Sequence, residues 1–315
     1  MKFRTELHVL KESFEIDYSG KLFFMGSCFS KTMYAELKKR GFKYLSGNPF
    51  GVLFNPISIA KVLHVTINRE EIKEDAFFEN QGIFRHWDFG SQVFEKDLKT
   101  TVYQLNKKIK EQHLFLKKAD VIFITLGTAW VYELVENKQV VANCHKMPSV
   151  LFRKSLLKVD EIQKTLTSLL ENLQKINYHV NVVFTVSPIR HIKNGIVENQ
   201  RSKAVLLLAV HEMLHNVKKC FYFPSYELLM DDLRDYRYYE KDMLHPNGQA
   251  VDYIWGKFKN AYFSEDTCKK IKQVEEIRKA LRHRSLSNML NNDQKFNDKI
   301  QIRIQELKRS IDFEL

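Results

Sequence analysis

Cysteine is scarce in this 315-residue chain, and the few thiols that it has are far apart. No Cys-x-x-Cys pair occurs among the four cysteines, which are Cys28, Cys144, Cys220 and Cys268. A long chain with so few cysteines at such wide spacing is untypical of a disulfide-stapled protein. We therefore expect all four thiols to be reduced.

Long apolar runs are also missing. No stretch approaches the roughly 20 consecutive apolar residues that a membrane-spanning helix needs. The first residues, MKFRTELHVLKESFEID, are interrupted by charge and lack the apolar centre of a signal peptide. These absences predict a cytoplasmic protein with no membrane partner.

The chain lacks the spacing patterns of common cofactor and metal sites. The segments GTAWVY and GNPFG match neither the dinucleotide-binding nor the P-loop pattern, and no short paired Cys/His spacing indicates zinc. The sequence therefore predicts no cofactor and no bound metal. A formal net charge of +12 would suit an anionic partner. The lysines are scattered through helix-like segments, however, so a nucleic-acid partner is not expected.

What the chain does contain is an alternation of strand-like and helix-like patterns. Apolar runs typical of strands lie at 21–25, 42–46, 119–127, 180–188 and 220–225. Helical patterns lie between them, at 29–41, 57–69, 99–118, 159–176 and 202–219. This alternation predicts an α/β fold, a central parallel sheet with helices on both faces. Ligands of such sheets bind beyond the carboxyl ends of the strands, so the polar residues after each strand are site candidates.

The sequence divides into two parts of different character. We expect one α/β domain over residues 1–263, with an insertion at 68–98, and a charged helical extension over 264–315. An apolar stripe at helical spacing marks the extension and consists of Ile271, Val274, Ile277 and Leu281. We expect these helices to pack on the domain or to mediate self-association.

A serine stands at the first strand-to-helix turn, in KLFFMGSCFSKTMYAELKKRG (21–41). Ser27 would lie at a helix N-terminus, where free N–H groups favour developing negative charge. Two interpretations follow: Ser27 is a nucleophile, or it is a helix N-cap, for which serine is a preferred residue. Cys28, its neighbour, is interpreted as a buried and inert thiol.

A serine hydroxyl needs a base, and the base is best oriented by a third group. The segment KDMLHPNG places Asp242 and His245 three residues apart in a turn before a predicted helix. Asp242 could then hold one imidazole nitrogen while the other faces Ser27. The alternative is a turn-capping aspartate beside a surface histidine.

Several long segments resemble the bacterial GSCFA family, which is placed within the SGNH, or GDSL-like, hydrolases. The resemblance runs from about residue 20 to 262 and is carried by MGSCFS, NPFGVLFNPISIA, TLGTAWVY, VANCHKMP, FTVSPIRH, ENQRSKA, FPSYELLMDDLRDYR and DMLHPNGQAVDYIW. It implies a three-layer flavodoxin-like fold. It also implies a serine nucleophile at Ser27 with an Asp-x-x-His pair at Asp242 and His245.

The sequence departs from the superfamily where an asparagine usually completes the oxyanion hole. Ala129 stands in that turn here, so the amide donor is missing. Losing one such donor can cost on the order of 10²–10³ in rate, so either another group substitutes or the activity is weak or different. The candidates are the backbone N–H groups of Ser27 and Gly51 and the side-chain amides of Asn48 and Asn143.

Other polar residues are candidates for substrate binding. His145 in NCHK, and Arg190 with His191 after the fourth predicted strand, would suit an anionic or polyol substrate. Trp87, in the insertion, is either a sugar-stacking platform or a packed side chain.

These observations and the resemblance predict a serine-dependent acyl-ester hydrolase, acting on a carbohydrate or small polar ester through an acyl-enzyme on Ser27. An acyltransferase that uses the same acyl-enzyme is one alternative. The other is a catalytically weak protein that binds a glycan or nucleotide-sugar through Arg190, His191 and Trp87.

Overall fold

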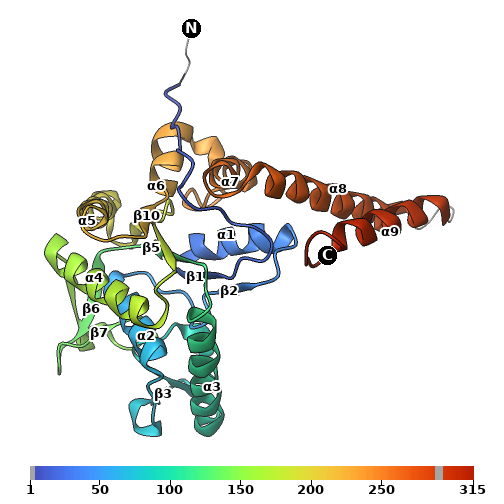
Figure 1. The fold of residues 1–315 in the computed structure, drawn as a ribbon. Helices are drawn as coiled ribbons and strands as arrows, with labels where there is room; N and C mark the ends of the chain where they lie inside the picture. Colours follow the sequence, from blue (N-terminus) through green and yellow to red (C-terminus); the bar gives the residue numbers. More distant parts are fainter. Residues whose placement is uncertain (1–3, 288–293) are drawn as a thin grey trace.

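A computed structural model describes residues 4–287 and 294–315. Its centre is a five-stranded sheet of β1 (Leu22–Gly26), β2 (Leu45–Gly47), β5 (Val121–Leu126), β9 (Asn181–Val186) and β10 (Cys220–Tyr222). The strands are ordered β10-β9-β5-β1-β2 and every neighbouring pair is parallel (Figure 1). This is the flavodoxin-like order, and it confirms the predicted α/β class.

Helices cover both faces of the sheet. One face carries α1 (Cys28–Lys39) and α7 (Gly248–Tyr262). The other carries α2 (Pro56–Asn68), α3 (Leu98–Leu116), α4 (Val159–Ile176) and α5 (Ile196–Leu214). Side chains of β1 alternate between the two faces. Leu22 and Phe24 pack on the side of α1 and α7, and Phe23 and Met25 pack on the side of α2 to α5. A sheet buried on both faces explains why its strands are continuous apolar runs.

One predicted helix is displaced in the structure. The helix expected over 202–219 runs over Ile196–Leu214, and it begins at Gly195, whose φ of +93° suits glycine. Ser202, where the predicted helix begins, therefore lies in the interior of the observed helix. The Ser202 hydroxyl lies inside the fold and accepts a hydrogen bond of 2.7 Å from the N–H of Ala129.

Two small antiparallel sheets are present that the sequence does not predict. A three-stranded sheet follows β5 and consists of β6 (Trp130–Leu134), β7 (Val140–Val141) and β8 (Phe152–Leu156), in the order β7-β6-β8. The segment predicted to be an insertion, 68–98, contains a hairpin of β3 (Phe78–Asn80) and β4 (Ile83–Arg85). Their strands are short and mix charged with apolar residues, so period-two alternation is weak in the sequence.

The segment after β10 has short helical turns only. It contains α6 (Ser225–Glu227), a π-helical turn (Leu228–Leu233) and a 3₁₀ turn (Tyr236–Tyr238), and then leads into α7. This segment lies on the side of the sheet that α1 and α7 cover, because Leu228, Leu229 and Leu233 belong to the same core.

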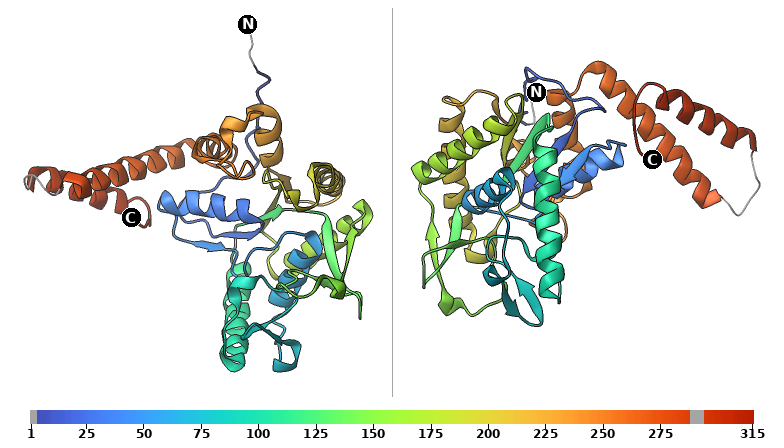
Figure 2. Two further views of the ribbon diagram at one scale, coloured as in Figure 1. Left: turned by 180° about the vertical axis from the view of Figure 1, so that it is seen from behind. Right: turned by 60° about the horizontal axis from the view of Figure 1, so that its bottom comes forward.

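The C-terminal helices α8 (Glu265–Ser287) and α9 (Gln294–Lys308) lie side by side and extend away from the sheet (Figures 1 and 2). Ile271, Val274 and Ile277 are buried in the core that includes α1 and α7. The chain end returns to the domain, where the N–H of Glu314 donates to the carbonyl of Gly41. The division of the chain at residue 263 remains a prediction. Within the residues described, no helix is both long and apolar enough to cross a membrane.

Candidate active site

Residues that follow four strands, β1, β2, β5 and β9, surround a small cavity at the carboxyl edge of the sheet. The cavity has a volume of about 40 Å³. It is lined by Ser27, Cys28, Phe54, Gly127, Thr128, Ser187, Ile189, Arg190 and His191. Parallel strands end at the same edge, so residues far apart in the sequence meet here.

Ser27 occupies the N-cap position of α1, but its side chain does not cap the helix. Its N–H donates to the carbonyl of Thr125 over 3.0 Å. The hydroxyl oxygen is buried and has no hydrogen-bond partner among the described residues. A buried polar group without a partner is costly, so a capping role does not account for this serine.

Glycine on either side allows the close approach that places Ser27 here. Gly26 has φ +130°, and a Cβ atom on it would lie 2.1 Å from the carbonyl oxygen of Thr125. A Cβ on Gly127 would lie 3.2 Å from the Cβ of Ser27. Any side chain at Gly26 would push β1 and β5 apart at the point where the serine emerges.

Asp242 and His245 are paired in the loop before α7. Oδ2 of Asp242 lies 2.6 Å from Nδ1 of His245, and Oδ1 accepts from the backbone N–H groups of Leu244 and His245. These bonds, the two from the backbone first, lower the pKa of Asp242 to about 2. The carboxylate therefore holds Nδ1–H, which leaves Nε2 as the proton acceptor.

Arg190 connects the cavity wall to the loop that carries this pair. Its guanidinium lies 4.4 Å from the ring centroid of Tyr239 and 5.1 Å from that of Tyr236. Tyr239 forms a backbone bridge with Pro246, directly after His245. The Ser27 hydroxyl and His245 are not hydrogen-bonded to each other in this structure.

Some of the candidate oxyanion donors already donate a hydrogen bond within the protein, and others do not. The N–H of Ser27 donates to the carbonyl of Thr125, and the N–H of Gly51 donates to the carbonyl of Asn48, each over 3.0 Å. Asn48 accepts from the N–H of Gly26 through Oδ1 over 2.8 Å, while its Nδ2 is buried and has no partner among the described residues. Cys28 begins α1, and the first N–H groups of a helix have no partner within it.

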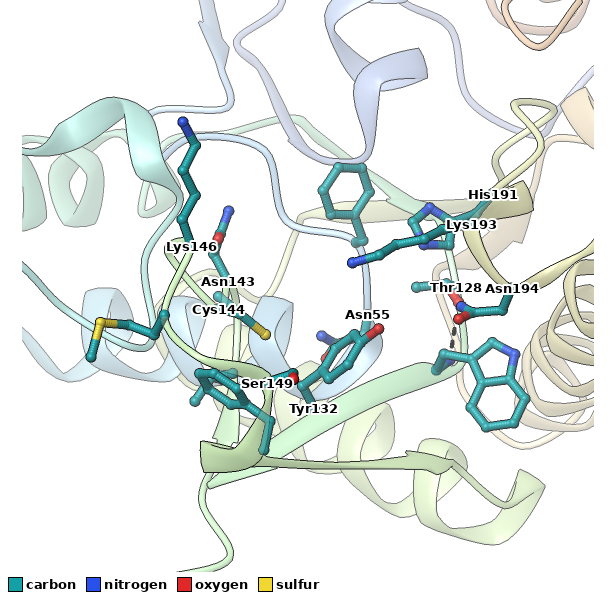
Figure 3. A pocket seen from close by; sticks show the side chains of 16 residues that line it. Asn55, Thr128, Tyr132, Asn143, Cys144, Lys146, Ser149, His191, Lys193 and Asn194 are labelled. Atoms are coloured by element: carbon teal, nitrogen blue, oxygen red, sulfur yellow. Dashed lines mark hydrogen bonds between the residues drawn. The ribbon is translucent and has the colours of Figure 1, made fainter. Parts of the chain in front are cut away.

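A larger cleft of about 630 Å³ adjoins the small cavity, and the two share Phe54, Thr128 and His191 (Figure 3). The sheet of β6, β7 and β8 forms one wall. The other lining residues are Asn55, Trp130, Tyr132, Val141, Ala142, Asn143, Cys144, Lys146, Met147, Ser149, Phe152, Lys193 and Asn194. Asn143 is thus in this cleft, and its Oδ1 accepts from the N–H of His145 over 2.7 Å.

His145 and Trp87 line neither cavity. His145 is buried against the rings of Phe78, Trp87 and Phe94, and its Nε2 is 3.0 Å from the carbonyl oxygen of His86. Burial lowers the pKa of His145 to about 4, so the ring is neutral. Trp87 stacks on Phe78 with 3.9 Å between centroids. The structure therefore does not bring these two side chains to Ser27.

Lys203 is a residue to which the sequence analysis assigns no role. It is 1% exposed, and its Nζ donates to the carbonyls of Gly127 at 2.8 Å and Ser187 at 2.7 Å. It thereby holds together the loops that follow β5 and β9, both of which line the cavity at Ser27. Burial lowers its pKa to about 7. The sequence could have indicated that Lys203 is buried, because helical spacing puts it on the same face of the helix as the apolar Leu206 and Val210.

No cluster of three or more His, Cys, Asp or Glu side chains suited to a metal ion occurs within residues 4–287 and 294–315.

The fold and the edge residues define a three-layer, flavodoxin-like α/β protein with its polar site at the end of the first strand. The chain belongs to the GSCFA family, whose model matches residues 21–258. A comparison with curated proteins gives no match.

Solved structures that are similar to parts of the chain include a carbohydrate esterase family 3 protein from Talaromyces cellulolyticus, at 12% identity and a TM-score of 0.27. A serine-to-alanine mutant of an acetyl esterase with acetate ion has 14% identity and a TM-score of 0.27. A carbohydrate esterase family 2 enzyme with a carbohydrate-binding domain, from Corynascus thermopiles (Myceliophthora fergusii), has 12% identity and a TM-score of 0.24.

The alignments cover 50%, 51% and 44% of this chain and 60%, 61% and 37% of those chains, in the same order. The chain thus spans about 60% or less of the length of the structures that it matches.

Proposed function

We propose that the protein is a serine-dependent acyl-ester hydrolase whose nucleophile is Ser27. The observation that supports this most is the buried Ser27 hydroxyl, which lies at a helix N-terminus and at a cavity without capping the helix. A volume of about 40 Å³ favours a small acyl group such as acetyl. The alcohol part of the ester would bind in the neighbouring cleft, and we propose that this alcohol is a carbohydrate.

The proposed reaction uses the Asp242–His245 pair as base and orienting group. Nε2 of His245 takes the proton of the Ser27 hydroxyl as Oγ bonds to the ester carbonyl carbon. The bond from that carbon to the alcohol oxygen then breaks, and the proton passes from His245 to the leaving alcohol. Water then attacks the acyl carbon and gives one proton to His245. The bond from that carbon to Oγ breaks, His245 returns the proton to Oγ, and the acid leaves, which restores Ser27.

This reaction requires the loop carrying His245 to bring Nε2 to the Ser27 hydroxyl, to which it is not hydrogen-bonded in this structure. Both side chains of the pair are 46% exposed, so moving them would not break a buried contact of that pair. Catalytic hydrogen bonds are commonly long in unliganded enzymes and tighten when substrate binds. Arg190 would keep the movement limited, because it stacks on the tyrosines of this loop.

A fluorophosphonate probe tests the proposal directly. We expect mass spectrometry to find the adduct on Ser27 in the wild-type protein and no adduct in Ser27→Ala. His245→Ala should lower the labelling rate at least tenfold, because nothing else removes the serine proton. Cys28→Ala, which changes the adjacent residue, should be labelled like the wild type. Labelling that does not depend on His245, or no labelling of Ser27 in the folded wild type, would contradict the mechanism.

We propose Asn48 as the side chain that replaces the missing oxyanion-hole amide. Its Nδ2 is buried and unpaired, and its Oδ1 accepts from the N–H of Gly26, the residue before Ser27. Asn48→Asp keeps an oxygen for the N–H of Gly26 and removes the donor. We expect kcat for 4-nitrophenyl acetate to fall by roughly 10²-fold, with a much smaller change in KM. A melting temperature near that of the wild type would separate this effect from unfolding. An unchanged kcat would exclude Asn48 as a donor.

A further inference from the structure

The charged side chains that line the cleft beside the Ser27 cavity are all positive. Two lysines line it, Lys146 and Lys193, and no aspartate or glutamate is found among its described lining residues. Figure 3 shows the two lysines on opposite sides, with the side chain of Lys193 reaching toward the middle of the cleft. A third lysine, Lys154, places its Nζ 3.9 Å from the ring centroid of Trp130, which is part of the lining.

Neither Lys146 nor Lys193 has a carboxylate partner within the part of the chain that the structure describes. Glu198 is the acidic residue that acts on Lys154, but its carboxylate pairs with Arg201 at 3.0 and 3.1 Å. The lysine charges in the cleft are therefore not neutralised by the protein. Unpaired cations gathered in a concave site favour an anionic ligand.

Lys193 acts electrostatically across the cleft. Its ammonium lies 5.9 Å from the ring centroid of Tyr132. Burial raises the pKa of the Cys144 thiol, and the charge of Lys193 opposes that rise. Loss of hydration, with smaller contributions from lysines that include Lys193, lowers the pKa of His191. Because Cys144 and His191 both line the cleft, the field of Lys193 reaches both walls.

The rest of the lining suits a carbohydrate ring. Trp130, Tyr132 and Phe152 offer aromatic surface, which is the usual wall of a small-molecule site. Asn55 and Asn143 use their Oδ1 atoms to accept from backbone N–H groups. Their amide Nδ2 groups have no partner among the described residues and remain as donors for hydroxyl or carboxylate oxygens.

We infer that the alcohol part of the substrate is an anionic carbohydrate, a sugar that carries a carboxylate or a phosphate, and that Lys193 binds its negative charge. The inference rests on the proposed function, in which Ser27 lines the small cavity and the adjoining cleft receives the alcohol. Arg190 lines the small cavity and not the cleft, so the anion in the cleft is assigned to Lys193.

Binding to Ser27→Ala tests this inference without any chemical step. Isothermal titration calorimetry would compare methyl β-D-glucuronide and the 6-phosphate of methyl β-D-glucoside with neutral methyl β-D-glucoside. We expect at least one anionic sugar to bind tenfold or more tightly than the neutral one in 20 mM salt, with the difference shrinking at 300 mM. Comparison of the two anions tells a carboxylate from a phosphate ligand.

Lys193→Gln in the same background should abolish most of the preference for the anionic sugar. Lys164→Gln is the matched control, because Lys164 lies on α4 and is 83% exposed. Equal affinity for charged and neutral sugars, no binding of either anionic sugar, or equal effects of the two lysine variants would overturn the inference. Failure of the proposed function is seen separately, as absence of fluorophosphonate labelling on Ser27.

Discussion

Replacing Asp242 by asparagine is expected to lower kcat for 4-nitrophenyl acetate by roughly 10³–10⁴-fold. In the structure Oδ1 of Asp242 accepts from two backbone N–H groups, and Oδ2 faces Nδ1 of His245. An asparagine that keeps the two backbone bonds must turn its NH₂ group toward Nδ1. His245 would then carry its proton on Nε2 and be unable to accept one from Ser27.

The fold should tolerate this change, because asparagine retains the turn that the carboxylate forms. Asp235→Asn is a matched control in the same loop, since Asp235 also accepts a backbone N–H bond, from Arg237, but does not contact His245. We expect the control to retain nearly full kcat. If both variants lost activity equally, or if Asp242→Asn retained it, the orienting role of Asp242 would be wrong.

Replacing Lys203 by methionine is expected to change how stability depends on pH. The pKa of Lys203 is about 7 in the folded protein, against its usual 10.5 in an unfolded chain. Between these values the unfolded state binds a proton that the folded state does not, so raising the pH stabilises the fold. The free energy of unfolding should gain about 1.4 kcal/mol for each pH unit from this residue. Below pH 7 both states are protonated and the contribution is flat.

Urea unfolding of the wild type and of Lys203→Met at pH 7.0, 8.0 and 9.0 measures this effect. Other titrating groups are shared by the two proteins, so the difference between their unfolding free energies isolates Lys203. We expect the wild type to gain about 2 to 3 kcal/mol on the variant over these two units. Lys164→Met, an exposed substitution, should show no such trend. A difference that is constant with pH would mean that Lys203 titrates normally.

Lys203→Met should also reduce turnover, because the carbonyls of Gly127 and Ser187 lose their shared donor beside Ser27. The neutral amine has two N–H donors, and these two carbonyls accept both. Lys203 is thus a positioning residue, and its loss should affect kcat more than KM.

Much of the fold was predictable because a sheet buried on both faces leaves a simple pattern. The helix at 159–176 has the predicted bounds, and each of the five strands of the sheet overlaps its predicted run. The order of those strands agrees with the fold that the family resemblance implies. The sequence predicts the start of α5 six residues too late, at Ser202. A serine followed by an apolar run resembles the start of a helix even when it lies inside one.

The small sheet of β6, β7 and β8 was not predictable from its sequence. Its strands are short and half-exposed, so they are stabilised by pairing with each other and not by a strong local pattern. This sheet forms a wall of the cleft beside Ser27. The part of the site that would select a substrate was therefore invisible in the sequence.

The sequence by itself determined which side chains follow the strands, including Ser27. It also determined the pairing of Asp242 with His245, because two residues three positions apart in one turn meet through local geometry alone. Only the tertiary structure decided which of the other candidates reach the edge. Asn143, Arg190 and His191 line cavities there, whereas His145 is buried among aromatic rings. It also decided that Lys203 lies between two loops. The physical reason is that such contacts join residues far apart in the chain, and no local pattern records a long-range contact.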